Sequence, residues 1–340
     1  MILIIIFFLA LGFITLFYGA KLVVIGLENI SYRLGLSHLM VGLTILAIGT
    51  SLPEIAVSIS GGFSKLYGVS PNIDGIVIGN KIGSFLTQIT LILGILGLSH
   101  KIFVSKWELK RESIMLFVSI FVFFIFAIDL ILTRVEAVVM MIIYFLYILL
   151  IIRSEKKLEQ DLETGLYCCD DIKLDPHCLE IADCARKTSS AKIDVGLFLF
   201  GLVILIIGAE ITILSAISLG EFFNIPANVI GILIVGLGTS LPELVADLTA
   251  LRRESHGIAV GDILGSNICD ILFATGAGAV ISEFSVPPVI LFFDIPMLLI
   301  ATSISVYFLW TARELKRWEA AFLIGFYGFY VLLKILFFQI

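Results

Sequence analysis

Two glutamates stand inside long apolar stretches of the sequence, and each closes the same hexapeptide, Gly-Thr-Ser-Leu-Pro-Glu. Glu54 and Glu243 are 189 positions apart. An ionised carboxylate at the centre of a membrane helix costs at least about 2.5–3.5 kcal/mol, so each one needs a bound cation, a proton or a basic partner. The preceding residue, Pro53 or Pro242, has no N–H for the carbonyl four residues back, which frees a backbone oxygen at the same depth. The motif therefore predicts a polar site within an apolar segment.

Hydroxyls and amides accompany the two glutamates at helical spacing. Residues three and four apart share one face of a helix, which gathers Thr50 and Ser51 with Glu54. The other residues grouped by this spacing are Thr239 and Ser240 with Glu243, the stripe Asn80, Ser84 and Gln88, and the stripe Asp262, Ser266 and Asp270. Apart from the nearby Cys269 the donors are oxygens and amides, which suit hard cations such as Ca²⁺, whereas transition metals prefer nitrogen or sulfur. The hydroxyls would also suit a monovalent hard ion, so the residues predict a transporter of one or two kinds of hard cation.

The motifs belong to an internal repeat. Residues 42–60 match 231–249, and the segment that follows each, 79–89 or 261–271, matches too. Each half holds five apolar spans, and because five is odd, the second half must enter the membrane from the opposite side. Inverted repeats are typical of secondary transporters, whose substrate site lies at the midplane between the halves. The Gly-x-x-x-Gly spacing within the second segment of each half is expected to serve close helix packing.

The composition agrees with this interpretation. Of 340 residues, 59% are hydrophobic and 15% charged, and the mean hydropathy is +1.11, which excludes a soluble enzyme or a disordered chain. The net charge of −6 gives no basic surface for nucleic acid. Stretches of about 20 apolar residues predict an all-α integral membrane protein with ten transmembrane helices, arranged as two inverted five-helix repeats. The predicted spans lie near 2–27, 37–61, 72–98, 112–130, 133–152, 193–219, 226–250, 257–281, 288–310 and 316–338.

The positive charges predict the orientation. Seventeen Lys and Arg residues fall in one set of loops and two, Lys65 and Arg134, in the other, so we expect both termini outside and the 153–192 loop in the cytoplasm. The predicted units are a first repeat over 1–152, this loop, and a second repeat over 193–340. The absence of a targeting leader and of a long loop domain favours a prokaryotic plasma membrane. The loop contains Cys168, Cys169, His177, Cys178 and Cys184, which we interpret as part of a solvated connector rather than a Zn²⁺ site.

The paired hexapeptides, each followed by a Gly-Ser segment, resemble the α-repeats of the sodium/calcium exchanger family within the cation/Ca²⁺ antiporter superfamily. The resemblance implies a ten-helix antiporter working by alternating access, in which the first and sixth spans slide against the rest. It implies Ca²⁺ held by the carboxylates of Glu54 and Glu243 and by the backbone of Thr50 and Thr239. It implies Na⁺ sites formed by Ser51, Ser84, Ser240 and Ser266 with backbone oxygens of Ala47 and Gly236. Asp270 and Gln88 occupy positions where the family usually has Asn or Asp.

Several residues depart from the family pattern. Gln88 is one methylene longer than usual, Phe85 replaces an Asn, and Asp262 replaces an Asn. Lys81 lies on the ligand stripe, three residues before Ser84, where it either snorkels or pairs with an acid such as Asp262, or occupies with its ammonium a site that Na⁺ fills elsewhere. On the last hypothesis the site would need about two Na⁺ per Ca²⁺.

Three other residues have two interpretations each. Asp247, four residues after Glu243, is either an attractor of ions at the inner vestibule or a solvated helix end. Lys21 and Glu210, in the first and sixth spans, are expected to form a structural ion pair rather than to take part in transport. None of them belongs to the predicted ligand set.

Alternatives to sodium/calcium exchange remain at this level. Two facing glutamates can share a proton, so a proton/calcium antiporter of the same fold is the near rival. An intramembrane hydrolase is disfavoured because no His-Glu-x-x-His motif stands in any span and no histidine accompanies Ser51 or Ser240 at membrane depth. A channel is disfavoured because broken-helix carboxylates suggest tight binding. We therefore expect no enzyme activity and no cofactor. The expected partners are the lipid bilayer and transported Ca²⁺ and Na⁺ or H⁺, with no obligate protein partner.

Overall fold

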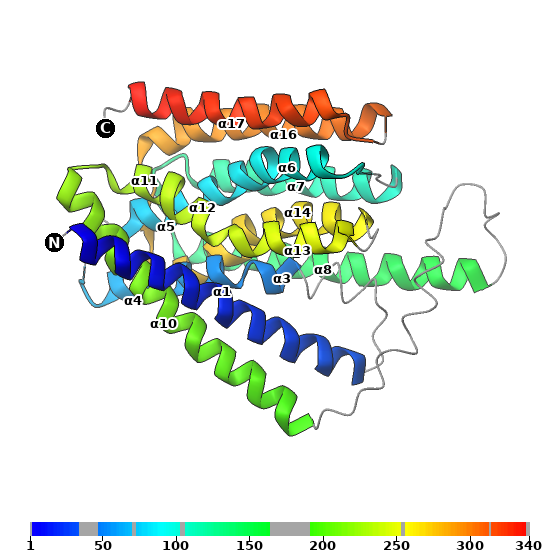
Figure 1. Ribbon diagram of the computed structural model, residues 1–340, viewed down its shortest axis with the longest axis horizontal. Coiled ribbons are helices and arrows are strands. Elements are labelled where there is room, and N and C mark those ends of the chain that lie inside the picture. Colours follow the sequence, from blue (N-terminus) through cyan, green and yellow to red (C-terminus); the bar gives the residue numbers. More distant parts are fainter. Residues whose placement is uncertain are drawn as a thin grey trace.

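The computed structural model of the chain is a bundle of long helices (Figure 1). It describes residues 2–33, 47–69, 73–102, 106–163, 191–252, 256–312 and 314–337. Within these ranges almost every residue is helical, which agrees with the predicted all-α class. The first residue of α1 and the last residue of α17 lie at the same end of the bundle, as an even number of crossings requires.

The two halves share two corresponding groups of elements. The first half contains α1 (Ile2–Arg33), α3 (Ala47–Thr50), α4 (Leu52–Leu66), α5 (Ile73–Leu86), the π-helix η2 (Thr87–Ile92), α6 (Leu93–Ser99), α7 (Lys106–Phe126), β1 (Ile131–Leu132) and α8 (Arg134–Glu163). The second contains α10 (Ala191–Phe223), α11 (Ala227–Ile230), η4 (Gly231–Val235), α12 (Gly236–Thr239), α13 (Leu241–Arg252), α14 (His256–Cys269), η5 (Asp270–Ala274), α15 (Thr275–Ile281), β2 (Phe284–Ser285), η6 (Ile290–Asp294), α16 (Ile295–Ala312) and α17 (Arg317–Phe337). The broken pair α3–α4 corresponds to α12–α13, and α5–η2–α6 corresponds to α14–η5–α15.

Eight helices of the described ranges are long and apolar enough to cross a membrane. They match eight of the ten predicted spans. Of the other two, the span near 37–61 lies partly outside the described residues, and α7 begins with a run of charged residues, Lys106 to Glu112. The structure thus supports a multi-pass helical membrane protein, and the count of ten remains a prediction.

Burial is inverted relative to a soluble protein. All fourteen residues of α5 are buried, including its polar ones. The outer helices α1, α8, α10 and α17 instead expose large apolar side chains, for example Leu3 (78%), Val135 (74%) and Phe200 (61%). An apolar surface of this extent is favourable against lipid and unfavourable in water. The polar residues of the repeat therefore face one another at the centre of the bundle.

Glycines bring α5 into backbone contact with η4 and α12. A Cβ at Gly83 would lie 2.2 Å from the carbonyl oxygen of Ile232, and one at Gly236 would lie 2.7 Å from the backbone nitrogen of Ser84. Gly79 approaches the backbone of Asn228 in the same way. The packing role predicted for the Gly-x-x-x-Gly pair of the first half is confirmed, and it holds Ser84 against the kinked helix of the opposite repeat.

The first and sixth predicted spans, α1 and α10, run side by side and obliquely to the other helices (Figure 1). Their backbones touch, because a Cβ at Gly19 would lie 2.7 Å from the backbone nitrogen of Leu205. The described structure contains no ion pair between Lys21 and Glu210, contrary to the expectation from their spacing. Lys21 is exposed, and close backbone packing holds the two helices together instead.

Short polar contacts tie the ends of the helices. β1 pairs antiparallel with β2, so that Ile131 lies opposite Ser285. Asp74 on α5 accepts hydrogen bonds from the Lys65 ammonium (2.5 Å) and from the backbone N–H of Ser285 (2.9 Å). These contacts join α4, α5 and the segment after α15 at one end of the bundle.

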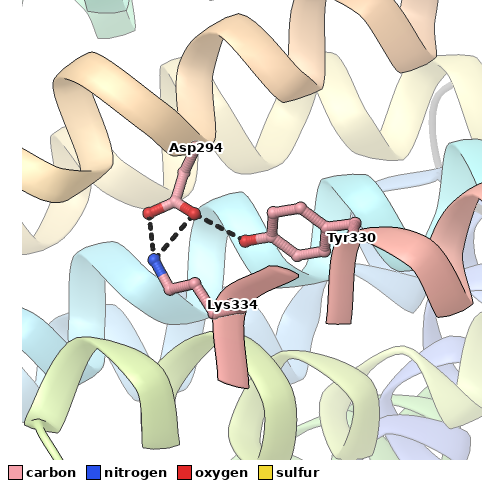
Figure 2. Close-up of polar contacts among 3 residues, drawn as sticks. All are labelled: Asp294, Tyr330 and Lys334. Atoms are coloured by element: carbon pink, nitrogen blue, oxygen red, sulfur yellow. Dashed lines mark hydrogen bonds and ion pairs between the residues drawn. The ribbon is translucent and has the colours of Figure 1, made fainter. Parts of the chain in front are cut away.

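A buried ion pair joins the last two spans. The Lys334 ammonium on α17 donates to both carboxylate oxygens of Asp294, at 2.8 and 2.6 Å, and the Tyr330 hydroxyl donates to the same carboxylate at 2.7 Å (Figure 2). Asp294 and Lys334 are fully buried, and Asp294 is the last residue of the π-helix η6. The pair lies apart from the repeat motifs and fixes α17 against the start of α16.

Candidate cation-binding site

The site begins at two equivalent breaks in helices. Ser51 separates α3 from α4 with φ −74° and ψ 1°, and Ser240 separates α12 from α13 with φ −84° and ψ 2°. Each following helix opens with Leu-Pro-Glu, which puts Glu54 and Glu243 in a first helical turn. The unpaired N–H groups of a helix N-terminus favour a carboxylate there. The identical hexapeptides therefore produce identical local structure in the two halves.

The Ser84 hydroxyl is the centre of the site. Its Oγ lies 3.0 Å from Glu54 Oε1, 2.8 Å from Ser240 Oγ and 3.2 Å from Asp270 Oδ2. A hydroxyl has one proton to donate, so it can satisfy only one of the two carboxylates at a time. The other carboxylate oxygen then needs a cation or a proton of its own. One side chain thus brings together acids from both repeats.

Gln88 links the stripes of the two halves. Its Nε2 lies 3.1 Å from Ser84 Oγ and 3.5 Å from Asp270 Oδ2, and its Oε1 accepts a hydrogen bond from Ser266 Oγ at 2.9 Å. The added methylene lets one amide reach residues of both repeats. On the second stripe, Ser51 Oγ donates to the backbone oxygen of Ser266 at 3.4 Å.

Both stripes change from α- to π-helix at the site. η2 starts at Thr87, next to Gln88, and η5 starts at Asp270 itself. The Thr275 hydroxyl donates to the backbone oxygen of Asp270 at 2.9 Å, across the wide turn. π-helical turns are rare and are found frequently at functional sites. Nothing in the sequence indicated these turns, because Thr, Ile and Leu are ordinary helix residues.

The two threonines make matching contacts across the pseudo-symmetry. Thr239 Oγ1 donates to Asn80 Oδ1 at 3.0 Å, and Thr50 Oγ1 donates to Asp262 Oδ1 at 3.2 Å. The backbone oxygens of Ala47 and Gly236 also lie at the breaks. Ala47 O accepts from Thr50 Oγ1 at 3.3 Å, and Gly236 O accepts from Ser240 Oγ at 2.8 Å. All of the predicted ligand and modulating residues are therefore gathered around the two breaks.

Lys81 is fully buried, and its ammonium donates to the backbone oxygen of Glu54. The acids that act on it electrostatically are Asp270, Glu54 and Glu243. The snorkelling interpretation is therefore wrong, because the side chain ends inside the site. Acids do act on Lys81, as the pairing interpretation expects, but Asp262, named as an example, lies by Thr50 instead. The side-chain nitrogen of Lys81 lies within the cluster of acids.

Several buried carboxylate oxygens have no hydrogen-bond partner in the structure: Glu54 Oε2, both of Glu243 and Asp270 Oδ1. All three side chains are 0% exposed. Leaving such atoms unpaired at membrane depth is costly, so these oxygens need a bound cation or a proton. In the described ranges no group of three Asp, Glu, His or Cys side chains is positioned to hold a metal alone. Hydroxyl and backbone oxygens must complete any coordination shell, and the breaks supply both.

Asp247 lies in the interior of the bundle, although one of its two interpretations was a solvated position. It is 0% exposed, so its interpretation as a solvated helix end is wrong. It follows Glu243 by one helical turn, so the two side chains lie on the same face of α13. This spacing is the sequence signal that places Asp247 on the interior face. The cysteines and His177 of the 153–192 loop, by contrast, lie outside the described residues.

The sequence of the chain was compared with known families. Residues 4–153 and 193–336 match the sequence model described as sodium/calcium exchanger protein. The chain belongs to the sodium/calcium exchanger family. The family is one of membrane transporters, and the matched residues cover both repeats while omitting the loop between them. The resemblance seen in the hexapeptides is thereby confirmed.

Individual relatives match this chain over most of their length. The sodium/calcium exchanger MaX1 of Methanosarcina acetivorans is 32% identical over 94% of this chain and 95% of its own. The putative antiporter CaxA of Alkalimonas amylolytica is 30% identical over 81% and 80%. A solved structure of the sodium-calcium exchanger NCX_Mj, soaked with 10 mM Na⁺ and zero Ca²⁺, has a TM-score of 0.63 at 26% identity, covering 98% of this chain and 99% of that one.

Proposed function

We propose that the protein is a secondary active antiporter that exchanges Na⁺ for Ca²⁺ across a membrane by alternating access. The observation that carries this proposal is the meeting of Glu54, Asp270 and Ser240 around the single hydroxyl of Ser84. The buried carboxylate oxygens that have no hydrogen-bond partner are the groups that we expect to bind cations. Family membership and the ions in the NCX_Mj soaks support Ca²⁺ and Na⁺ as those cations.

The ligands divide by chemistry. Ca²⁺ takes about 6–8 oxygens and prefers carboxylates, so the proposed Ca²⁺ ligands are the carboxylates of Glu54 and Glu243 and the backbone oxygens of Thr50 and Thr239. A monovalent ion needs less negative charge. The proposed Na⁺ ligands, shared with the acid Asp270 and the amide Gln88, are the hydroxyls of Ser51, Ser84, Ser240 and Ser266 and the backbone oxygens of Ala47 and Gly236. Asn80 and Asp262 orient the threonines in this scheme.

Lys81 sets the proposed stoichiometry. Glu54, Glu243 and Asp270 contribute three negative charges, and the buried ammonium compensates one of them. The remaining two charges are neutralised equally by one Ca²⁺ or by two Na⁺. Exchange of two Na⁺ for one Ca²⁺ moves no net charge, so we expect transport that is insensitive to voltage.

Alternating access is assigned to the pair α1 and α10. The two helices lie obliquely to the bundle (Figure 1). They contact each other through glycine-lined backbone and expose large apolar side chains. A pair that is bound to itself more closely than to its neighbours can slide as a unit. The proposed topology has ten spans in two inverted repeats, both termini outside and the 153–192 loop in the cytoplasm of a prokaryotic cell.

The test is ⁴⁵Ca²⁺ uptake into proteoliposomes loaded with Na⁺, with Na⁺-free vesicles and a pH jump as separate arms. Glu54→Gln serves as the inactive control, because it removes one proposed Ca²⁺ ligand without changing size. Uptake driven by the Na⁺ gradient and absent in Glu54→Gln supports the proposal. Uptake equal in the Na⁺-loaded and Na⁺-free vesicles contradicts it.

Proton/calcium exchange is the second candidate. Lys81 and Gln88 bring N–H donors where hydroxyl or carboxylate ligands of Na⁺ are expected, and Ser84 has one proton for two carboxylates. Both features suit a site that takes up a proton in place of Na⁺. Uptake that responds only to the pH jump would establish this function in place of the first.

A further inference from the structure

Two further acids lie beside the proposed site without belonging to it. Asp247 on α13 and Asp262 on α14 are both 0% exposed, and their carboxyl groups face each other across these neighbouring helices. Asp247 follows Glu243 by one turn, and Asp262 precedes Ser266 by one turn. The pair is therefore one helical turn removed from the centre at Ser84.

Three of the four carboxylate oxygens have no donor group from any other described residue, and the two carboxyl groups lie within hydrogen-bonding reach of each other. The three are both oxygens of Asp247 and Oδ2 of Asp262, while Oδ1 of Asp262 accepts from Thr50 Oγ1 at 3.2 Å. The groups of the described chain that act on the pair are the two acids themselves, Thr50, Glu243 and the more distant Asp270, and none of these is basic. The buried Lys81 interacts with other acids. The pair thus adds two acidic groups with no basic side chain beside them in the described ranges.

The equivalent positions of the first repeat are neutral. Asp247 corresponds to Ser58, and Asp262 corresponds to Asn80, with the same offsets that relate the motifs. The Thr239–Asn80 hydrogen bond reproduces the Thr50–Asp262 bond with an amide in place of the acid. The fold therefore tolerates Ser and Asn in this geometry, and the acids are not needed to form it.

The acid pair lies on one side of the centre only. α13 runs from the break at Ser240 to Arg252, and α14 returns from His256, so both acids lie between the centre and that turn. The end of α13 and the start of α14 lie at the same end of the bundle as the end of α6 and the end of α16 (Figure 1). Glu243 also interacts with Asp262, which makes the chain of acids continuous from Asp247 to the centre.

We propose that Asp247 and Asp262, with the Thr50 hydroxyl, form a second binding site for a divalent hard cation such as Ca²⁺, on the path between the centre and the α13–α14 turn. Two carboxylates bring two charges, which one divalent ion neutralises and one Na⁺ does not. The donors are oxygens only, as hard cations prefer. A cation moving between the centre and that side of the membrane would bind at this second site. The path to the other side of the membrane has no equivalent acid pair. This inference rests on the proposed cation exchange, because it assigns a step on that path.

The test is a count of bound ⁴⁵Ca²⁺ per chain at equilibrium, on purified full-length protein in lipid nanodiscs without Na⁺. We expect two Ca²⁺ for the wild type, one for Asp247→Ser/Asp262→Asn and one for Glu54→Gln. The double variant carries the residues of the first repeat, so it should fold, and an unchanged melting temperature checks this. Glu221→Gln, which neutralises an exposed acid at the far end of α10, is the matched control and should bind two.

Three results overturn the second site. They are one Ca²⁺ per wild-type chain, an unchanged count in the double variant, and a double variant that alters only proton release while its bound ⁴⁵Ca²⁺ stays at the wild-type count. Asp262→Asn alone, which keeps an oxygen for Thr50, should weaken the second Ca²⁺ at least tenfold. Failure of the exchange proposal is distinguishable, because it would abolish Na⁺-driven uptake in vesicles and leave the equilibrium count at two.

Discussion

At the scale of single residues, the site contains more hydrogen-bond acceptors than donors. Ser84 meets two carboxylates with one hydroxyl proton, and Gln88 and Lys81 donate their N–H groups to neighbouring oxygens. The remaining carboxylate oxygens are buried without partners. Individual side chains in such a cluster control how many cations bind, and two of them give direct predictions.

Replacing Ser84 by Ala should weaken Na⁺ binding at least about tenfold, because a hydrogen bond to a charged group contributes about 1.5–3 kcal/mol. The measurement is the Na⁺ concentration that half-displaces bound ⁴⁵Ca²⁺. Ser99→Ala is the matched control, since the exposed Ser99 hydroxyl only bonds its own helix, at Ile95 O. Equal Na⁺ displacement curves for the two variants would contradict a ligand role for Ser84.

Replacing Lys81 by Ala removes the fixed charge and leaves the three acids to be neutralised by transported ions. We expect three Na⁺ per Ca²⁺ and hence a net movement of charge. Ca²⁺ uptake by the variant should then respond to an imposed K⁺ diffusion potential, whereas uptake by the wild type should not. Voltage-insensitive uptake by Lys81→Ala would rule out the substitution of Na⁺ by the ammonium.

At the scale of helices, the sequence predicted the helix breaks before Glu54 and Glu243 but did not predict the π-helical turns η2 and η5. Pro53 and Pro242 identify the breaks because a missing N–H has a local effect. The π-turns at Gln88 and Asp270 depend on packing between repeats, which no local pattern records. The snorkelling interpretation of Lys81 and the solvated-end interpretation of Asp247 are wrong for the same reason, since the burial of both residues depends on which helix lies opposite.

The buried pair of Asp294 and Lys334 gives a prediction for helix packing (Figure 2). Lys334→Met should lower the free energy of unfolding by about 3–5 kcal/mol, because it leaves a buried carboxylate without its cation. The double variant Asp294→Leu/Lys334→Met should recover most of this loss. Thermal unfolding in detergent measures both.

An exposed ion pair provides the control for that measurement. Lys101 and Glu314 are 3.5 Å apart, and their side chains are 76% and 33% exposed. Lys101→Met should cost no more than about 1 kcal/mol, because water already solvates both charges. A loss for Lys334→Met no larger than this would mean that the buried pair does not hold α17 in place.

At the scale of the whole molecule, composition predicted a multi-pass helical membrane protein, and the resemblance of the paired hexapeptides predicted the exchanger family. Apolar stretches predict spans individually, and eight of them appear as such in the described residues. The orientation is a matter of charge in the loops, which the fold alone does not determine, and it leads to a topological prediction.

The loop cysteines can report the orientation. Cys168, Cys169, Cys178 and Cys184 should react with a membrane-impermeant maleimide in inside-out vesicles and not in right-side-out ones. Cys269 is fully buried and should contribute no background. In a variant with Ser at the four loop positions, Glu221→Cys at the opposite end of α10 should show the reverse pattern. Labelling of the loop from outside would invert the proposed topology.

The π-turns of η2 and η5 limit which sequence changes such chains can accept during evolution. A π-turn holds one residue more than an α-turn, so each of these helices carries a surplus residue at the level of the site. Deleting it would rotate everything beyond, α6 or α15, by about 100° and turn a different face to its neighbours. Insertions and deletions between Gly83 and Gly94, or between Gly265 and Gly276, should therefore be selected against more strongly than most substitutions there. The lengths of these segments should therefore change more slowly among related chains than the identities of their residues.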